Sequence, residues 1–379
     1  MNSVTHQAMP SAVQTFDWML PLVVLGLISF GLIMVASASI DSAAEHYNDA
    51  WFFTKRHAIY LLLAAISSAL LATVPSAIWQ RYAGVLLMLG FVLLIIVLIP
   101  GVGRSVNGSQ RWLSAGPISV QVSEVMKFCL ILFFASFLAR KQEKIAAGWA
   151  VFMTMIVIMA VVVLLLLMQP DFGSAVVICF TCGAMMFVGG VRLFRFIVLA
   201  LIAIAGLSAM AILSPYRWQR LVTFMDPWSD QFSSGYQLVQ SLIAFGRGEW
   251  FGVGLGNSIQ KLFFLPEAHT DFVFAIISEE LGLVGAVGLI SAFVVMIYKI
   301  FSISRRASEQ GKLFISFVSF GVAIMLAGQA FVNMGVAAGL LPTKGLTLPL
   351  ISYGGSSLLV TCALLTLVTR MDWELRRHE

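Results

Sequence analysis

The chain has 379 residues, of which 60% are hydrophobic and 11% are charged. A typical soluble domain is about 45–50% apolar and about 25% charged, so this composition excludes an ordinary water-soluble fold. The net charge of +5 does not indicate nucleic-acid binding, because the basic residues form short clusters between apolar runs, as they do in the loops of membrane proteins. No polar block is long enough for a separate domain, so residues 1–379 are predicted to form one membrane domain.

Ten apolar runs are long enough to cross roughly 30 Å of hydrocarbon. In chain order they cover about 18–39, 58–74, 83–100, 118–139, 149–168, 173–190, 193–213, 271–300, 313–341 and 347–369. The nine tryptophans all fall at span ends or in loops, where the amphipathic indole ring prefers the membrane interface. The predicted fold class is therefore all-α: a polytopic integral membrane protein with about ten transmembrane helices and one large extracytoplasmic loop, about 214–270.

The distribution of basic residues predicts the orientation. An even number of spans places both termini on the same side of the membrane. If the termini are inside, the inner segments contain 13 Lys and Arg residues and the short outer segments contain five. The positive-inside rule then predicts cytoplasmic termini and an outward-facing 214–270 loop, which is rich in Trp, Phe, Gly and Gln and is expected to be structured at the membrane surface.

Polar residues at the start of the fourth span form the first candidate constellation. Glu124 and Lys127 are three residues apart on one helical face and are predicted to pair, as charges at this depth must. The pair is either a structural one that fixes helix packing, or part of a site in which Lys127 or the preceding Arg111 offers positive charge to an anionic substrate.

Two acidic positions follow at other span ends. Asp171, in the short Gln169–Gly173 link, either caps the next helix or belongs to a site. Asp271 follows His269 where the long loop enters the membrane; it is either a helix cap or a general base. Glu279-Glu280 are expected near mid-bilayer, where they are either functional or neutral or paired packing residues.

The last constellation opens the tenth span. Tyr353 is followed by the pair Gly354-Gly355 and by the two hydroxyl residues Ser356-Ser357. Glycines let the backbone approach a ligand, and exposed amides with two hydroxyls suit an anionic oxygen such as that of a pyrophosphate. The alternative is a kink used for helix packing.

The predicted topology places Arg111, Asp171, Asp271 and the Tyr353 segment together at outward-facing span ends. Chemistry on that side has no ATP, so a leaving group on the substrate itself, such as a lipid pyrophosphate, must drive it. The sequence contains no Walker-type nucleotide loop.

The ordered motifs resemble the SEDS family of shape, elongation, division and sporulation proteins over nearly the whole chain. They are Gly108–Leu113, Gln121–Lys127, Gln169–Gly173, Pro227–Gln237, Leu265–Phe272 with Glu279–Gly282, and Pro349–Ser357. One departure is Val122, where many members have proline; this change touches no charge. Details such as Glu267-Ala268-His269 favour a division member over an elongation member.

The resemblance implies a peptidoglycan glycosyltransferase that polymerises lipid II during septal wall synthesis. It further implies a class B penicillin-binding protein, the septal transpeptidase, and other divisome membrane proteins as partners, with location at the division septum of the inner membrane. By the same resemblance Asp271 is the catalytic carboxylate, Glu124 and Lys127 are the intramembrane pair, and Asp171 is the acidic turn residue. Arg111, His269 and residues 353–357 complete the predicted substrate site.

The expected reaction joins two lipid-linked units at the outer leaflet. Asp271 would remove a proton from the acceptor hydroxyl as it attacks the donor's anomeric carbon, and lipid pyrophosphate would leave. The sequence leaves open whether Asp271 is the base or a ligand of a divalent metal, Mg²⁺ or Mn²⁺; no nucleotide is expected. A lipid II flippase and a non-catalytic division scaffold are the competing functions.

Overall fold

The computed structural model describes residues 17–106, 108–115, 118–145, 149–212, 224–233, 235–342 and 345–377. Residues 214–223 of the predicted long loop lie outside this description. The helices are α1 (Met19–Tyr47), α2 (Phe52–Leu71), α3 (Ser76–Ile96), α4 (Val122–Ile145), α5 (Trp149–Met168), α6 (Phe172–Val188), α7 (Leu193–Ile212), α9 (Tyr236–Gly248), α10 (Val273–Glu309), α11 (Leu313–Ala337) and α12 (Gly355–Arg377). The short turns η1 (Pro227–Asp230) and η2 (Gln260–Phe264) flank α9, and three strands precede α4.

Within the described residues, a helix occupies each of the ten predicted spans, so the polytopic all-α class is confirmed. Six of these helices are long and apolar enough to cross a membrane by length and composition, and α6 is a shorter apolar helix. Several predicted boundaries are wrong. The helices of the first, eighth and tenth spans continue eight or nine residues beyond the predicted ends, to Tyr47, Glu309 and Arg377. Residues 118–121 form a strand, because they pair with a preceding strand, and residues 347–354 form a folded loop before α12.

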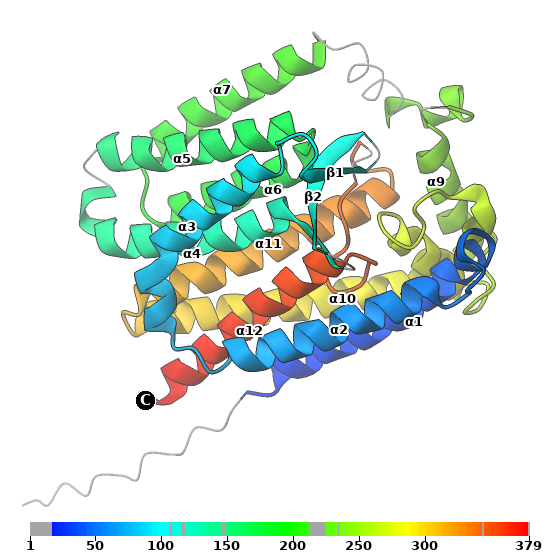
Figure 1. The fold of residues 1–379 in the computed structure, drawn as a ribbon, viewed down its shortest axis with the longest axis horizontal. Helices are drawn as coiled ribbons and strands as arrows, with labels where there is room; N and C mark the ends of the chain where they lie inside the picture. Colours follow the sequence, from blue (N-terminus) through cyan, green and yellow to red (C-terminus); the bar gives the residue numbers. More distant parts are fainter. Residues whose placement is uncertain are drawn as a thin grey trace, which may run out of the picture.

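The helices pack around α4 and α11. Helix α11 contacts α4, α6 and α10, and α4 contacts α3 and α6 as well. Figure 1 shows α5 and α7 on one side of these two helices and α1 and α2 on the other. The start of α1 and the end of α12 lie at the same end of the bundle, where Arg376 Nη2 is 3.1 Å from Asp17 Oδ2.

The peripheral helices expose apolar side chains outward, as a hydrocarbon solvent requires. Leu62, Leu164, Phe180 and Val294, from four different helices, are each more than half exposed. In water such continuous apolar surface would favour association, whereas in lipid it is the expected exterior. The molecule is therefore a multi-pass membrane protein.

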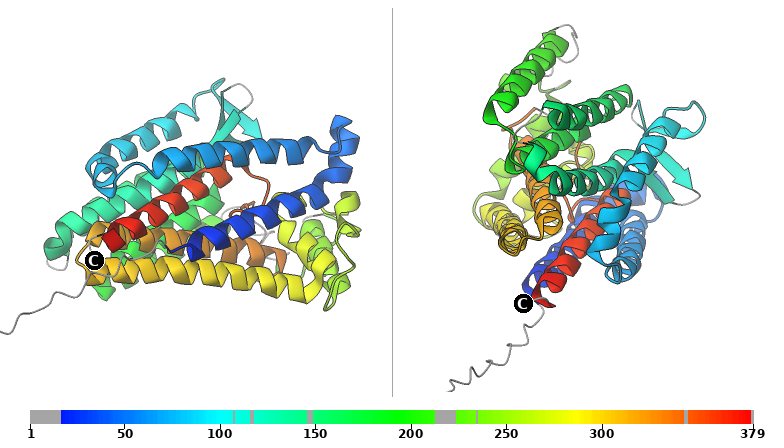
Figure 2. Two further views of the ribbon diagram at one scale, coloured as in Figure 1. Left: turned by 90° about the horizontal axis from the view of Figure 1, so that it is seen from below. Right: turned by 90° about the vertical axis from the view of Figure 1, so that its left-hand side faces the viewer.

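A small antiparallel sheet, which the sequence did not predict, covers the entrance to α4. Strands β1 (Gly103–Val106), β2 (Ser109–Ala115) and β3 (Ile118–Gln121) pair in the order β1-β2-β3. Trp112 lies opposite both Arg104 on β1 and Gln121 on β3. The sheet fixes the direction of Arg111, the neighbouring β2 residue, and runs directly into α4 (Figure 2).

Helix α10 is interrupted at Gly282, which has a φ of 68°. The amides of Val253 and Gly254 donate to the carbonyls of Glu279 and Glu280, both at 3.0 Å. These loop amides are hydrogen-bond partners for carbonyls that the break leaves without a partner in the helix. The backbone at the interruption therefore keeps its hydrogen bonds. The Gly252–Gly256 run thus closes the broken helix, a role unrelated to the dinucleotide binding that its spacing superficially suggests.

Candidate active site at one end of the helix bundle

Asp271 lies in the loop immediately before α10, and its backbone is fixed from two sides. Its amide donates to the carbonyl of Glu267 at 3.1 Å, and its carbonyl accepts from Nδ2 of Asn333 on α11 at 2.8 Å. The same Asn333 amide donates to the carbonyl of Leu346 at 2.6 Å. Helix α11 therefore joins the Asp271 loop to the segment that leads into α12.

The Asp271 side chain is half-buried and faces the backbone of Gly345. A Cβ atom on Gly345 would lie 2.8 Å from Oδ2 of Asp271. Burial, reinforced by the negative charge of Glu267, raises the pKa of Asp271 to about 7, against the opposing positive charge of Arg111. A carboxyl group with this pKa exchanges its proton near neutral pH, as a general base must.

His269 and Tyr353, from motifs far apart in the sequence, meet beside Asp271. The amide of Tyr353 donates to the carbonyl of His269 at 2.9 Å, and the two ring centroids are 5.6 Å apart. Phe53 at the start of α2 lies 4.3 Å from the His269 ring and 5.2 Å from the Tyr353 ring. Burial lowers the pKa of His269, so its ring is neutral at pH 7. The rings of Phe53, His269 and Tyr353 together form an aromatic wall.

Arg111 reaches from β2 to the turn between α5 and α6. Its guanidinium donates to the carbonyls of Gln169 at 3.2 Å and Pro170 at 2.5 Å. Nη1 lies 3.6 Å from Oδ1 of Asp171, and the Arg111 side chain is 24% exposed. Since its charge also acts on Asp271, Arg111 connects the acidic turn to the loop that carries the candidate base.

Asp171 is the N-cap residue of α6, which is the structural alternative that the sequence left open. Its Oδ1 accepts from the amide of Ser174 at 3.2 Å, and its Oδ2 accepts from Nε2 of Gln121 at 3.3 Å. The carboxylate is almost completely buried. These contacts give Asp171 a positioning role for Arg111; contact with substrate stays a prediction.

Glu124 and Lys127 pair with each other inside α4, as their spacing predicts. Lys127 Nζ lies 2.7 Å from Oε1 of Glu124, and both side chains are buried. Among the described residues, no hydrogen bond or ion pair joins this pair to Asp271 or Arg111. The geometry thus supports the structural reading of the pair, and the substrate role of Lys127 stays a prediction.

The Gly354–Ser357 segment is packed more tightly than a ligand cradle. A side chain on Gly355 would overlap the ring of Tyr60 on α2, so the close approach of this glycine is to protein and not to a ligand. The Ser357 hydroxyl accepts from the Thr347 hydroxyl at 3.1 Å. Ser356 is buried and its hydroxyl has no hydrogen-bond partner among the described residues.

Residues 17–377 match the family model of FtsW, RodA and SpoVE, described as cell cycle protein. The chain belongs to this family. The resemblance seen in the ordered sequence motifs is thereby confirmed.

Relatives in the FtsW/RodA/SpoVE family cover nearly the whole chain. A Saccharophagus degradans protein named "Probable peptidoglycan glycosyltransferase FtsW" is 59% identical, covering 96% of this chain and 94% of the relative. A Coxiella burnetii protein of the same name is 49% identical, covering 95% and 97%. The match to these FtsW proteins agrees with the predicted similarity to a division member.

Two solved structures share the fold of this family protein. A chain described as "Structural coordination of polymerization and crosslinking by a peptidoglycan synthase complex" has 32% identity and a TM-score of 0.76, covering 95% of this chain and 98% of that one. The crystal structure of Rod shape determining protein RodA from Thermus thermophilus has 29% identity and a TM-score of 0.70, covering 95% and 97%.

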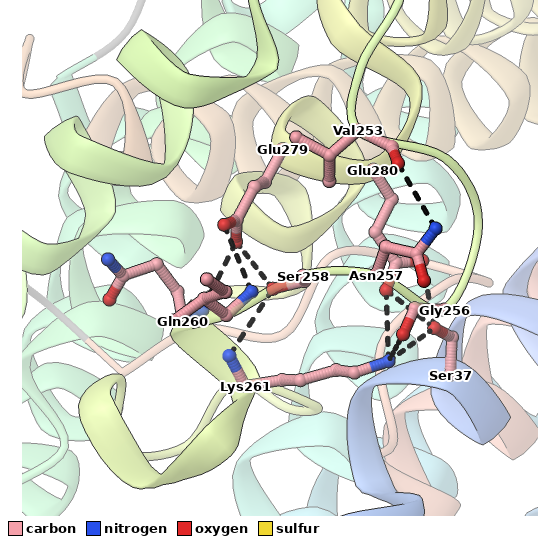
Figure 3. Close-up of polar contacts among 10 residues, drawn as sticks. Ser37, Val253, Gly256, Asn257, Ser258, Gln260, Lys261, Glu279 and Glu280 are labelled. Atoms are coloured by element: carbon pink, nitrogen blue, oxygen red, sulfur yellow. Dashed lines mark hydrogen bonds and ion pairs between the residues drawn. The ribbon is translucent and has the colours of Figure 1, made fainter.

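Glu279 of this FtsW/RodA/SpoVE family protein holds the loop beside α10. Its carboxylate accepts from the Ser258 hydroxyl and from the amides of Ile259 at 3.1 Å and Gln260 at 3.3 Å (Figure 3). Arg247 Nη1 on α9 lies 3.3 Å from Oε1. The side chain is completely buried, so Glu279 is a paired packing residue.

Glu280 connects the same loop to α1. It accepts from the Ser37 hydroxyl at 2.7 Å, and Lys261 Nζ lies 3.2 Å from its Oε1 (Figure 3). Because Lys261 also donates to the Ser37 hydroxyl at 3.3 Å, the three groups form a closed network. Both carboxylates are thus paired packing residues, one of the alternatives that the sequence left open, and they hold the 252–264 loop on the helices.

The residues that shape the site include some that sequence reasoning missed. Asn333 is a polar residue within an apolar run, and that is a signal which could have revealed it, whereas His57 follows the polar run Thr54-Lys55-Arg56 and gives no such signal. His57 is buried 6.1 Å from the Tyr353 ring, and neither of its ring nitrogens has a hydrogen-bond partner among the described residues. Gly345 gives no comparable signal, because only the fold places it against Asp271.

The metal question depends on the acidic residues near Asp271. Among the described residues there is no group of three or more His, Cys, Asp or Glu side chains that could hold a metal ion. Mg²⁺ is commonly held by one or two carboxylates together with substrate phosphates. Asp271, whose pKa is affected by the charge of nearby Glu267, fits an arrangement in which one or two carboxylates hold the ion together with substrate phosphates.

Proposed function

We propose that this protein is a peptidoglycan glycosyltransferase that polymerises lipid II at the outer face of the cytoplasmic membrane during septal wall synthesis. The observation that carries the proposal is the half-buried Asp271, whose pKa is raised to about 7 and whose position is fixed by Asn333 and Gly345. Relatives named peptidoglycan glycosyltransferase FtsW, up to 59% identical in the examples above, support the same reaction.

The chemistry assigned to Asp271 is proton removal. Its carboxylate takes the proton of the acceptor sugar hydroxyl while that oxygen bonds to the anomeric carbon of the donor, and the bond from this carbon to the lipid pyrophosphate oxygen breaks. General-base assistance of this kind typically contributes about 10²–10⁴-fold in rate. The raised pKa makes the ionised form a stronger base than an ordinary aspartate would be.

Arg111 is the described cation best placed to stabilise the leaving group. It is partly exposed, lies on the rigid β2 strand and acts electrostatically on Asp271. Positive charge already fixed where negative charge develops lowers the barrier without further rearrangement. Its bonds to Gln169 and Pro170 and its contact with Asp171 hold the guanidinium in place.

The alternative role of Asp271 in this proposal is that of a metal ligand: Asp271 and the substrate phosphates would hold a divalent cation, Mg²⁺ or Mn²⁺. When bound, it would supply further neutralisation of the pyrophosphate charge. In that arrangement Asp271 would hold the cation in place of removing the proton, because a bound cation makes the carboxylate a weaker base. The positioning of Arg111 is the same in both arrangements.

The proposed setting follows from the predicted topology and from the relatives. Both termini are assigned to the cytoplasm, and Asp271 to the opposite side, at the division septum. The proposed partners are a class B penicillin-binding protein, which is the septal transpeptidase, and other divisome membrane proteins. A family member solved as part of a peptidoglycan synthase complex supports such an assembly.

The flippase alternative relied on intramembrane charges that could line a path for a head group. Lys127, Glu279 and Glu280 are each buried and paired with a side chain of opposite charge. Opening a path through these groups would separate buried pairs, at a typical cost of about 3–5 kcal/mol for each pair broken. The geometry therefore favours catalysis at the end of the bundle over transport through it.

The test is a polymerisation assay with the purified protein and its transpeptidase partner. Lipid II is supplied in liposomes, and glycan strands are separated by length. Wild type is expected to make polymer, whereas Asp271→Asn should reduce the initial rate by at least about 100-fold. Asp49→Asn is a matched control, because Asp49 is an exposed acid paired with Lys55.

The outcomes separate the three functions. Polymer from wild type and Asp49→Asn but not from Asp271→Asn supports the enzyme. Movement of lipid II between leaflets without polymer would establish the flippase. If neither occurs while the partner's transpeptidase activity is stimulated, the protein is a scaffold.

A further inference from the structure

A lateral groove lies between α1, α2 and α12, at the end of the bundle where the described chain begins and ends. Helix α2 packs against both α1 and α12 (Figure 2). The groove has a volume of about 600 Å³. Ligand pockets commonly occupy about 300–1,000 Å³, so the groove is large enough for much of a lipid chain.

The groove wall is apolar and opens toward the surrounding lipid. Ala64 and Ala65 of α2, Ile28 of α1 and Leu365 of α12 line it. Leu25 and Ala65 are exposed, whereas Ala64 and Leu365 are buried, so the lining passes from the outer surface into the bundle. The alanines that α2 contributes are small and leave space that larger side chains would fill.

The groove ends at a basic, aromatic group on the last turns of α12. Arg370 and Trp373 line the groove, and the Arg370 guanidinium carbon lies 4.1 Å from the centroid of the Trp373 ring. Arg377 stacks on the same ring at 3.7 Å. Nε of Arg370 is buried and pairs with Glu374 Oε1 at 3.3 Å, which fixes the guanidinium beside the groove, whereas Arg377 is exposed and adds a second positive charge.

This groove is separate from the candidate active site. Tyr353, which meets His269 beside Asp271, precedes the first residue of α12, whereas Arg370 lies 15 residues further along that helix. At about 1.5 Å per residue the two sites are roughly 22 Å apart along the helix axis. A ligand in the groove therefore occupies the opposite leaflet from the proposed reaction.

We propose that the groove binds one anionic phospholipid of the cytoplasmic leaflet, with an acyl chain between α1, α2 and α12 and a phosphate at Arg370 and Arg377. The leaflet assignment rests on the orientation given in the proposed function; the lipid site does not. Basic pockets between membrane helices at the cytoplasmic side bind anionic head groups, and the tryptophan marks the depth of the interface.

The lipid would connect helices that otherwise have little direct contact. Helices α1 and α12 both contact α2, and the ion pair between Arg376 on α12 and Asp17 just before α1 joins their ends. A bound acyl chain fills the space between them, because hydrocarbon contacts replace the missing side-chain contacts. The site is thus a structural lipid site that stabilises this end of the bundle.

The experiment measures lipid retained by the delipidated full-length protein in detergent. Tetraoleoyl cardiolipin and dioleoyl phosphatidylcholine are added in separate titrations, and native mass spectrometry counts the bound lipids. Wild type is expected to retain one cardiolipin in preference to phosphatidylcholine. Arg370→Gln and Arg377→Gln should each weaken cardiolipin binding roughly fivefold, as expected for the loss of one cation near an anionic head group.

The groove itself is tested by a matched pair of variants on α2. Ala65→Trp fills the groove and should abolish retention of cardiolipin. Ala69→Trp makes the same change at an exposed position that does not line the groove, and binding should persist. Arg305→Gln removes an exposed arginine elsewhere and serves as the charge control. A thermal unfolding scan of every variant shows whether it is folded.

Several results would overturn the lipid site. Equal retention of phosphatidylcholine and cardiolipin would remove the role of the arginines, and equal behaviour of the two tryptophan variants would remove the groove. Preferential retention of a prenyl phosphate in place of cardiolipin would assign the groove to a different lipid class. Because binding is read without lipid II turnover, a failure here is distinct from a failure of the polymerisation assay.

Discussion

Asp271 combines a carboxyl group with surroundings that favour its protonated form. Burial raises its pKa, the neighbouring charge of Glu267 adds to the shift, and Arg111 opposes it. In the folded state this group binds its proton more tightly than in the unfolded chain. Its contribution to stability is therefore fully present below the unfolded pKa and is lost as pH rises through about 7.

The first prediction concerns the pH dependence of polymerisation. A general base works in its ionised form, so the rate should increase as pH rises through about 7 and then level off. The measurement is the initial rate of glycan synthesis at saturating lipid II over a series of buffers. Asp271→Glu serves as a comparison, since it keeps a carboxyl group but displaces it. A rate that is flat across neutral pH would contradict the assignment of Asp271 as the base.

Gly345 is predicted to be important for catalysis because it has no side chain. A Cβ atom at this position would lie 2.8 Å from Asp271 Oδ2, so Gly345→Ala should displace the carboxylate. A displacement of about 1 Å at a catalytic group can cost roughly 100-fold in rate. We expect a loss of that size in kcat with an unchanged thermal midpoint.

Gly84→Ala is the control for this substitution. Gly84 lies within α3, and a Cβ atom there would have no heavy atom within 4 Å. That variant should retain the wild-type rate. If Gly345→Ala polymerises as fast as Gly84→Ala, the packing of Gly345 on the Asp271 carboxylate is not required for catalysis.

At the scale of elements, the interrupted α10 and the loop around it depend on buried charges. Glu280, Lys261 and Ser37 form a closed network that joins the loop to α1. Removing one charge leaves the other buried without its partner, which typically costs about 3–5 kcal/mol. Removing both charges leaves no isolated ion and should cost less.

A double-mutant cycle tests this network. Lys261→Met and Glu280→Gln should each lower the thermal midpoint clearly, while the double variant should recover part of the loss. Lys55→Met and Asp49→Asn form the control cycle, because that ion pair is exposed and such pairs contribute about 0–1 kcal/mol. Additive losses at Lys261 and Glu280 would show that the two side chains do not stabilise each other.

The elements also show which features can be predicted from the sequence. The ten apolar runs located the long helices, because a hydrocarbon solvent imposes length and apolarity directly on the sequence. The i,i+3 spacing located the Glu124–Lys127 pair, and the short Pro-Gly link indicated the Asp171 cap. These features depend on local spacing alone.

Features that depend on distant contacts were missed. The strand 118–121 was predicted to be helical because its apolar residues continue into α4, and only pairing with β2 reveals it. The loop partners of Glu279 and Glu280 were not predicted, since nothing local indicates that the 252–264 loop folds over them. The contact between Gly345 and Asp271 has no sequence signal for the same reason.

For the whole molecule, the two ends of the bundle have different chemistry. One end carries Asp271, the aromatic wall and Arg111. The other carries Asp17, Arg306 and Asp372 in a chain of ion pairs, in which Arg306 Nη1 lies 2.7 Å from Asp372 Oδ1. Charges anchored at that end agree with the basic inner segments that predict cytoplasmic termini.

The last prediction tests this orientation directly. Single cysteines are introduced at Thr270 and at Arg377 after each native cysteine is replaced by serine or alanine; the native ones are free. A membrane-impermeant maleimide applied to intact spheroplasts should label the Thr270→Cys protein, while Arg377→Cys should react only after the membrane is opened. The two residues lie at opposite ends of the bundle, so their labelling must differ if the helices span the bilayer. Labelling of Arg377→Cys from outside, with Thr270→Cys protected, would put Asp271 on the cytoplasmic side, where an extracytoplasmic polymerase cannot have its catalytic base.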